Sequence, residues 1–96
     1  MKIDFSKNDG NLNVALDGRL DTTTAPELDS FLAENTAGVS SLTIDCENLA
    51  YISSAGLRVL LSAHKKMGGA MKLTHVCELV MEVFDMTGFA DILEIE

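Results

Sequence analysis

Two adjacent serines, Ser53 and Ser54, stand between a polar segment and an apolar helical pattern that begins with Gly56 and Leu57. A serine hydroxyl at the start of a helix accepts a hydrogen bond from a backbone N–H two or three residues later, which makes serine a common helix cap. The unpaired N–H groups and the helix dipole at the same position also favour a negative charge, such as a phosphate group. The pair therefore allows two roles, a structural cap and a hydroxyl that accepts phosphate.

Catalysis by these serines is not expected. A serine nucleophile needs a base within hydrogen-bond reach, and the chain has only two histidines, His64 and His75. Ser54 and His64 fall on one predicted helix, about 15 Å apart along its axis. His75 lies in a neighbouring loop and stays open as a base, but the serines lack the GxSxG pattern of a nucleophile elbow. The sequence also lacks glycine-rich nucleotide-binding motifs, so we expect neither enzyme activity nor a cofactor.

A metal site is a weaker alternative. Asp21, Asp45 and Glu47 would supply the carboxylate oxygens that hard divalent cations prefer, if these side chains converged. No spacing motif joins them, so solvated acids at strand ends are the favoured interpretation. Cys46 and Cys77 form neither a CxxC pair nor a cluster with histidine, and we expect reduced, largely buried cysteines instead of zinc ligands.

Size and charge narrow the class of protein further. The chain has 96 residues, 47% of them hydrophobic, which predicts a single domain, 1–96, with one modest core. The 15 acidic and 7 basic residues give a net charge of −8, which makes nucleic acid a poor partner. No run reaches the length of a membrane span, and the N-terminus lacks the apolar segment of a signal peptide. We therefore expect a cytoplasmic protein.

The N-terminal part of the chain predicts an antiparallel hairpin. Apolar and polar residues alternate over 3–6 and again over 12–17. The turn residues at 8–11, Asn-Asp-Gly-Asn, favour a tight connection between the two strands. Gly18 is expected to end the second strand.

A first helix is predicted to follow this hairpin. Thr24 and Glu27 have the spacing of a capping box, in which each side chain bonds to the backbone N–H of the other residue. Pro26 is tolerated in the first turn of such a helix. Ala37 and Gly38 are expected to end it.

The remainder of the chain alternates strands with helices. The predicted elements are a central strand over 42–46, a helix over 54–67, a strand over 71–74, a helix over 78–86 and a strand over 92–95. This order implies an α/β fold, with a mixed, mostly parallel sheet of about five strands, an N-terminal antiparallel hairpin and three main helices. The carboxyl ends of parallel strands share one edge. The loops 20–24 and 48–56 should therefore meet, with Asp21 near Ser53 and Ser54.

The second predicted helix carries an unusual concentration of positive charge. Arg58, Lys65 and Lys66 lie on its polar stripe and are three of the seven basic residues of the chain. A solvated helix face is the simpler interpretation, and a surface for a partner is the alternative.

The third predicted helix has a core face formed by two apolar pairs, Leu79 with Val80 and Val83 with Phe84. Met81 falls off that face among acidic residues. It could be an exposed methionine at a contact surface or a loosely packed core residue.

Several segments taken together resemble one known family. They are Gly18-Arg19-Leu20-Asp21, Leu42-Thr43-Ile44-Asp45-Cys46, Tyr51-Ile52-Ser53-Ser54-Ala55-Gly56-Leu57, Gly68-Gly69 and Phe84-Asp85-Met86-Thr87-Gly88-Phe89. In this order and spacing they resemble a STAS domain of the anti-sigma factor antagonist type, over essentially the whole chain. The serine loop and the Phe-Asp-Met-Thr-Gly segment are specific together, although each alone is a weak signal.

The resemblance implies a partner-switching protein. In its unphosphorylated form such a domain binds an anti-sigma factor that is also a serine kinase, and thereby frees the sigma factor. The kinase phosphorylates the STAS serine with ATP and magnesium, and a metal-dependent PP2C-type phosphatase removes the phosphate. The family serine usually sits two residues before the glycine of the loop, which is Ser54 here. Asp21 matches the acidic residue of the family beside that site.

By the same resemblance, the residues near the site or in contact with the partner are Asp21, Thr22, Ser53, Gly56, Leu57 and Arg58. The chain departs from the family at one position, because many members have aspartate directly before the phosphorylated serine and this chain has Ser53. Ser53 is therefore the less favoured acceptor. The alternative function is a STAS module that is never phosphorylated, acting as a constitutive adaptor or as a subunit of a transport or sensory complex.

Overall fold

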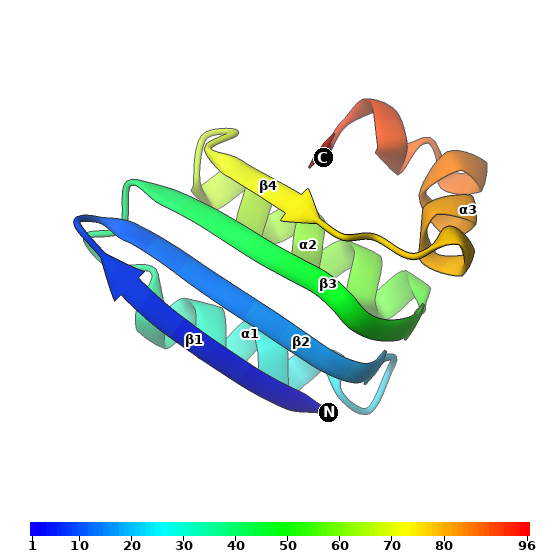
Figure 1. The fold of residues 1–96 in the computed structure, drawn as a ribbon, viewed down its shortest axis with the longest axis horizontal. Helices are drawn as coiled ribbons and strands as arrows, with labels where there is room; N and C mark the ends of the chain where they lie inside the picture. Colours follow the sequence, from blue (N-terminus) through cyan, green and yellow to red (C-terminus); the bar gives the residue numbers. More distant parts are fainter.

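A five-stranded sheet organises the computed structural model, which describes residues 1–96 (Figure 1). Its strands follow one another across the sheet in chain order: β1 (Lys2–Asn8), β2 (Asn11–Leu20), β3 (Ser41–Ile52), β4 (Met71–Thr74) and β5 (Glu94–Ile95). The first pair is antiparallel and the other three pairs are parallel. This confirms the predicted mixed, mostly parallel sheet with an N-terminal hairpin, and it places β3 at the centre.

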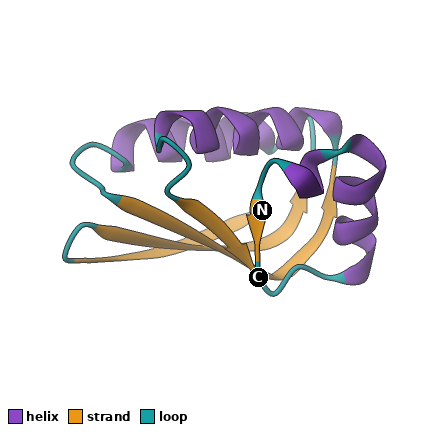
Figure 2. Cartoon of the chain, turned by 90° about the horizontal axis from the view of Figure 1, so that it is seen from above, coloured by secondary structure: helices purple, strands orange, loops and turns teal.

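Three helices complete the fold, namely α1 (Ala25–Asn35), α2 (Ser54–Lys66) and α3 (Glu78–Thr87), followed by a short 3-10 helix at Phe89–Asp91. Figure 2 shows α1 and α2 side by side on one face of the sheet, while the opposite face carries no helix. The third helix stands at the end of the sheet toward which β3 and β4 run (Figure 1). None of the helices combines the length and apolar character needed to span a membrane.

The core lies between the sheet and the helices on its covered face. Along the first six residues of β2 and the first half of β3, every second residue is buried, as the alternating sequence predicts. These residues pack against apolar residues of the helices, such as Leu28 on α1 and Leu60 on α2, both fully buried. All 20 residues of the core cluster are hydrophobic, and no polar or charged residue is buried.

The second half of β3 differs from the prediction, because strand pairing continues to Ile52 where the sequence indicated a loop over 48–56. Two irregularities in the pairing of β2 with β3 each place one extra residue on β3. As a result, the buried positions change from every second residue to Cys46, Leu49 and Ile52. Because buried residues three apart do not alternate with exposed ones, the sequence pattern does not predict a strand here.

The end of β2 also differs from the prediction. Gly18 does not end the strand but lies within it, at φ +113°, next to one of the two irregularities. The strand runs on to Leu20, so β2 and β3 end side by side. The last strand, in contrast, is shorter than predicted, since only Glu94 and Ile95 pair with β4.

The third helix packs through a narrower face than predicted. Val80 and Phe84 are fully buried, and Val83 packs against the core from a partly buried position. Leu79 was expected in the core but is 52% exposed. Met81 instead packs against the core. A helix at the end of a sheet is covered on one side only, so one stripe of residues four apart is buried.

Gly56, in the first turn of α2, permits a close approach of this helix to the ends of β2 and β3. A Cβ atom at this position would lie 2.7 Å from Leu20 Cγ and 2.9 Å from Ile52 Cγ1. Both neighbouring side chains are themselves buried, at 0% and 2% exposure, and have little room to move.

Substitution of Gly56 by alanine should therefore destabilise the protein through overpacking, by about 1–3 kcal/mol. Urea unfolding measured for Gly56→Ala beside Ser54→Ala tests this, because Ser54 is exposed on the same helical turn. A Gly56→Ala protein as stable as its Ser54→Ala control would contradict the close packing.

Candidate functional site

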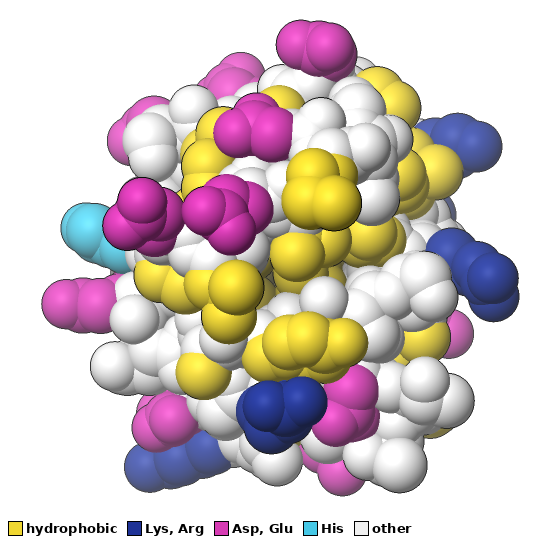
Figure 3. Space-filling model, turned by 90° about the vertical axis from the view of Figure 1, so that its right-hand side faces the viewer, with side chains coloured by type: hydrophobic (Ala, Val, Ile, Leu, Met, Phe, Trp, Pro, Cys, Tyr) yellow, Lys and Arg dark blue, Asp and Glu magenta, His cyan; other side chains and the backbone are white.

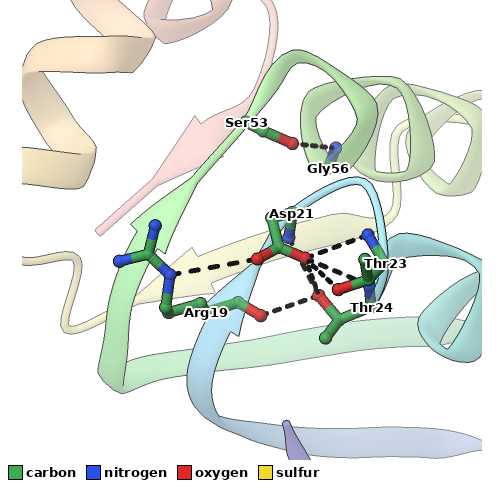
Figure 4. A network of polar contacts seen from close by, with 6 residues as sticks. All are labelled: Arg19, Asp21, Thr23, Thr24, Ser53 and Gly56. Atoms are coloured by element: carbon green, nitrogen blue, oxygen red, sulfur yellow. Dashed lines mark hydrogen bonds and ion pairs between the residues drawn. The ribbon is translucent and has the colours of Figure 1, made fainter.

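The candidate site lies where the carboxyl ends of β2 and β3 meet the start of α2 (Figure 4). Leu20 and Ile52 are register partners in the last pair of the two strands. One residue later, the Ser53 N–H donates a hydrogen bond of 2.9 Å to the carbonyl oxygen of Leu20. The loop that begins with Asp21 therefore lies next to the two serines, as the shared edge of parallel strands predicted.

The two serines have different roles in this structure. Ser53 has extended backbone angles, φ −104° and ψ 176°, and its hydroxyl accepts a long hydrogen bond of 3.4 Å from the Gly56 N–H. It is the N-cap of α2. Ser54 is the first residue of the helix and is exposed, and its side chain forms no hydrogen bond within the chain. Ser53 thus caps the helix, and the adjacent Ser54 provides a hydroxyl with no bond to the rest of the chain.

Asp21 is the centre of a hydrogen-bond network in the loop between β2 and α1. Its carboxylate oxygen Oδ1 accepts bonds from the Thr23 N–H at 3.0 Å, the Thr23 hydroxyl at 2.8 Å and the Thr24 N–H at 3.2 Å. These donors, led by the Thr23 hydroxyl, hold the pKa of the Asp21 carboxyl below its ordinary value of 3.8. Thr22 is exposed at the tip of the same turn.

This network corrects the predicted capping box of Thr24 and Glu27. Thr24 precedes α1, but its hydroxyl forms no cap bond to the helix. The hydroxyl instead donates to the carbonyl oxygen of Arg19 at 2.7 Å and accepts a bond from the Asp21 N–H at 2.8 Å. The carboxylate of Asp21 already receives the N–H of Thr24, so the turn is closed by Asp21 and not by a reciprocal bond to Glu27.

Arg19 and Tyr51 form a second contact that the sequence analysis missed. The guanidinium carbon of Arg19 lies 4.3 Å from the centre of the Tyr51 ring, and Arg19 Nε lies 3.9 Å from Asp21 Oδ2. The two residues are register partners on β2 and β3. This pairing could be found from the sequence only after β3 had been extended to Ile52.

The other predicted site residues are split between the core and the surface. Gly56 and Leu57 are buried, so they position α2 and cannot contact a partner directly. Arg58 is exposed on α2, with no carboxylate within the 4.0 Å range of an ion pair.

The three acids considered for a cation do not converge. Asp45 and Glu47 lie close to His75, with one ligand atom of each within 4.8 Å of the others, but Asp21 is not part of this group. Asp45 Oδ1 lies 3.1 Å from His75 Nδ1. The group is partly or fully exposed, so its members are already solvated and we assign no ion to it.

The cysteines are placed as expected for core residues. Cys46 is buried and Cys77 partly buried, and both are free. Burial raises the pKa of the Cys46 thiol to about 12, so this residue stays protonated at neutral pH. Neither cysteine belongs to a group of metal-ligating side chains.

Figure 3 views the molecule from the end of the sheet where α3 stands. Hydrophobic side chains form a visible band across the middle of this face, with acidic side chains on one side of it and Lys and Arg at the opposite border and below. On α3, Leu79 and Met86 are 52% and 87% exposed. The end of the molecule where α3 stands therefore presents an apolar surface with charged groups of both signs, a composition suited to protein contacts.

An open sheet with two helices on one face, and an exposed serine at the start of the second helix, together define a small α/β domain. A STAS domain family model matches residues 2–96, and the chain belongs to this family. The anti-sigma-B factor antagonist of Bacillus subtilis (strain 168) is 31% identical over 98 residues, covering 99% of this chain and 90% of the relative. A Bordetella bronchiseptica protein named as the anti-sigma factor antagonist BtrV is 36% identical over 99 residues, covering 99% and 85%.

Solved structures share the same fold. An anti-sigma factor antagonist from Mycobacterium paratuberculosis has a TM-score of 0.87 at 22% identity, covering 98% of this chain and 83% of that chain. The anti-sigma factor antagonist SpoIIAA, a Bacillus cell fate determinant, has been solved unphosphorylated and phosphorylated, with TM-scores of 0.76 and 0.75 at 14% and 15% identity. These matches cover 99% of this chain and 87% and 91% of those chains.

The division of roles between the serines predicts different effects on stability. Ser53→Ala should lower the free energy of unfolding by about 0.5–1 kcal/mol, because the cap bond is lost. Ser54→Ala should change it by less than about 0.5 kcal/mol, as for other exposed positions. Chemical denaturation of the two variants tests the assignment, and a larger loss in Ser54→Ala would reverse it.

The network around Asp21 predicts a pH dependence. Because the folded state lowers the pKa of this carboxyl, its ionised form contributes stability that is present above pH 4 or so and is lost as the pH falls through the lowered pKa. Asp21→Asn keeps an oxygen acceptor but removes the charge. The stability advantage of the original protein over Asp21→Asn should therefore shrink between about pH 4 and pH 2.

Urea midpoints of both proteins across this pH range provide the measurement. A difference between them that stays constant with pH would show that the Asp21 charge is not held by the network.

Proposed function

We propose that this protein is an anti-sigma factor antagonist that is switched off by phosphorylation of Ser54. Its curated relatives with this name match the chain over nearly its full length. The observation that supports the switch most directly is the pair of serines, since Ser53 caps α2 and leaves the exposed Ser54 hydroxyl without a structural role. Ser54 also stands two residues before Gly56, the position of the phosphorylated serine in the family.

A phosphate on Ser54 is compatible with the fold. It adds roughly −1.5 to −2 charges, and the dipole of α2 interacts favourably with negative charge at this end, by about 0.3–1 kcal/mol. SpoIIAA, which shares the fold, has been solved in both phosphorylation states. The modification is therefore expected to change the surface and to leave the structure intact.

The effect on a partner follows from this local change. A protein that covers the start of α2 and the Asp21 loop would meet a bulky dianion in place of a hydroxyl. Each 1.4 kcal/mol of resulting penalty weakens binding about tenfold. The partner would be an anti-sigma factor with serine kinase activity, and a PP2C-type phosphatase would restore the binding form. Both steps would take place in the cytoplasm.

The chain itself acts as a binding protein in this proposal. Ser54 has no base hydrogen-bonded to it, and His75 is paired with Asp45 just beyond the end of β4. The phosphoryl transfer is carried out by the kinase, to which Ser54 is a substrate.

Binding to the anti-sigma factor kinase encoded in the same genome tests the proposal. Ser54→Ala should bind in the presence of ATP without loss over time, while protein carrying phosphoserine at position 54 should bind at least about tenfold more weakly. Ser53→Ala is the matched control, and it should lose binding with ATP as the original protein does.

Two outcomes would contradict the proposal. Equal binding by Ser54→Ala and the phosphoserine protein would show that the charge at position 54 does not affect binding to the partner, and would favour a constitutive adaptor. Loss of the ATP effect in Ser53→Ala, with the effect retained in Ser54→Ala, would move the switch to Ser53.

A further inference from the structure

Arg58 lies one helical turn after Ser54 on α2, and both side chains are exposed. Residues four apart in a helix are neighbours on its surface. The helix contains no acidic residue between Ser54 and Lys66, so Arg58 has no carboxylate partner on its own element.

The rest of the chain leaves Arg58 without a partner as well. The chain holds 15 acidic side chains, and Lys2, Arg19 and Lys72 each have a carboxylate within 4.0 Å. No carboxylate lies within that distance of Arg58. Its guanidinium is therefore free for an anion that the unmodified chain does not carry.

We propose that Arg58 is the phosphate-binding residue of this protein, forming an ion pair with a phosphomonoester on Ser54. The proposal rests on the proposed function, since it assumes phosphate at that serine. The order of the charges is the favourable one, with the anion N-terminal to the cation at a spacing of four residues. The planar guanidinium can donate two parallel N–H bonds to phosphate oxygens, which an ammonium group cannot do.

Two other cations, Lys65 on the same helix and Arg19 on the neighbouring strand, are less suited to this place. Lys65 lies three turns further along α2, about 16 Å from Ser54 along the axis. Arg19 belongs to the neighbouring strand end, but its guanidinium is held over the Tyr51 ring and beside the Asp21 carboxylate. The negative charge of Asp21, which lies beside Arg19, would also oppose a second anion at that guanidinium. Of these three cations, Arg58 alone lies one helical turn from Ser54 and has no carboxylate partner.

The ion pair gives phosphorylation a second effect on binding. In the unmodified protein Arg58 is available to a carboxylate of the partner. In the phosphorylated protein it is occupied by the phosphate of its own chain. The modification thus adds a charge at Ser54 and also withdraws a cation from the same face of α2.

The pKa of the phosphate measures this contact directly. Phosphoserine is incorporated genetically at position 54 of the full chain, and its second ionisation, near pH 6 in the free amino acid, is followed by ³¹P NMR. The pKa should be lower with Arg58 present than in Arg58→Gln by about 0.3, which corresponds to the strength of a helical ion pair. Lys65→Gln is the matched control and should titrate like the original protein.

Equal phosphate pKa values in the original protein and Arg58→Gln would overturn the proposal. An equal rise in Lys65→Gln would also overturn it, because the effect would then come from the net charge of the helix. The phosphate is installed without a kinase, so the result does not depend on whether cells modify Ser54. Failure of this test would leave the switch itself standing, and failure of the binding test above would leave the ion pair measurable.

Discussion

The junction between the ends of β2 and β3 determines the geometry of the whole site. At this point the Ser53 N–H donates to the carbonyl oxygen of Leu20, and the side chains of Leu20 and Ile52 come so close to Gly56 that no Cβ atom fits there. The start of α2, the Asp21 loop and the two strand ends are therefore held together by one hydrogen bond and one tightly packed contact. The Ser53 cap at the start of α2 and the Asp21 loop are therefore brought side by side at this junction.

This arrangement leaves the Ser54 hydroxyl exposed and free of structural bonds. The start of α2 is stabilised by the hydrogen bond between Ser53 and Gly56. The turn before α1 is closed by hydrogen bonds between Asp21 and two threonines. Ser54 contributes to neither. Under the proposed switch, a charge added at Ser54 would change the surface that a partner contacts, while the bonds that hold the junction would remain. The STAS family membership and the names of the relatives agree with a protein whose output is binding.

Much of the fold could be predicted from the sequence because its signals are local. Alternation and the Asp-Gly turn predicted the hairpin, and β4 lies over the predicted residues. The second half of β3 could not be predicted, since two extra residues change the buried spacing and remove the alternation. On α3, Met81 packs against the core and Leu79 is exposed, the reverse of the prediction for Leu79. Which residues of a helix are packed depends on where the helix docks, and local periodicity does not encode this.

The site was predictable in outline for a different reason. The rule that carboxyl ends of parallel strands share an edge brought Asp21 to the serines without knowledge of side chains. The choice of cap between Ser53 and Ser54 depends on the residue at which α2 begins, and adjacent serines are equivalent in sequence. The contact of Arg19 with Tyr51 required the correct strand register. The start of α2 decides which hydroxyl is free, and the strand register decides which side chains meet beside it.

The most direct test of this account is the intact mass of the protein isolated from its native cells under several growth conditions, with fragmentation to place any phosphate. The account predicts a phosphorylated fraction with the phosphate on Ser54 and none on Ser53. A phosphate on Ser53 would contradict the division of roles between the two serines. A protein that is unmodified under every condition would contradict the switch.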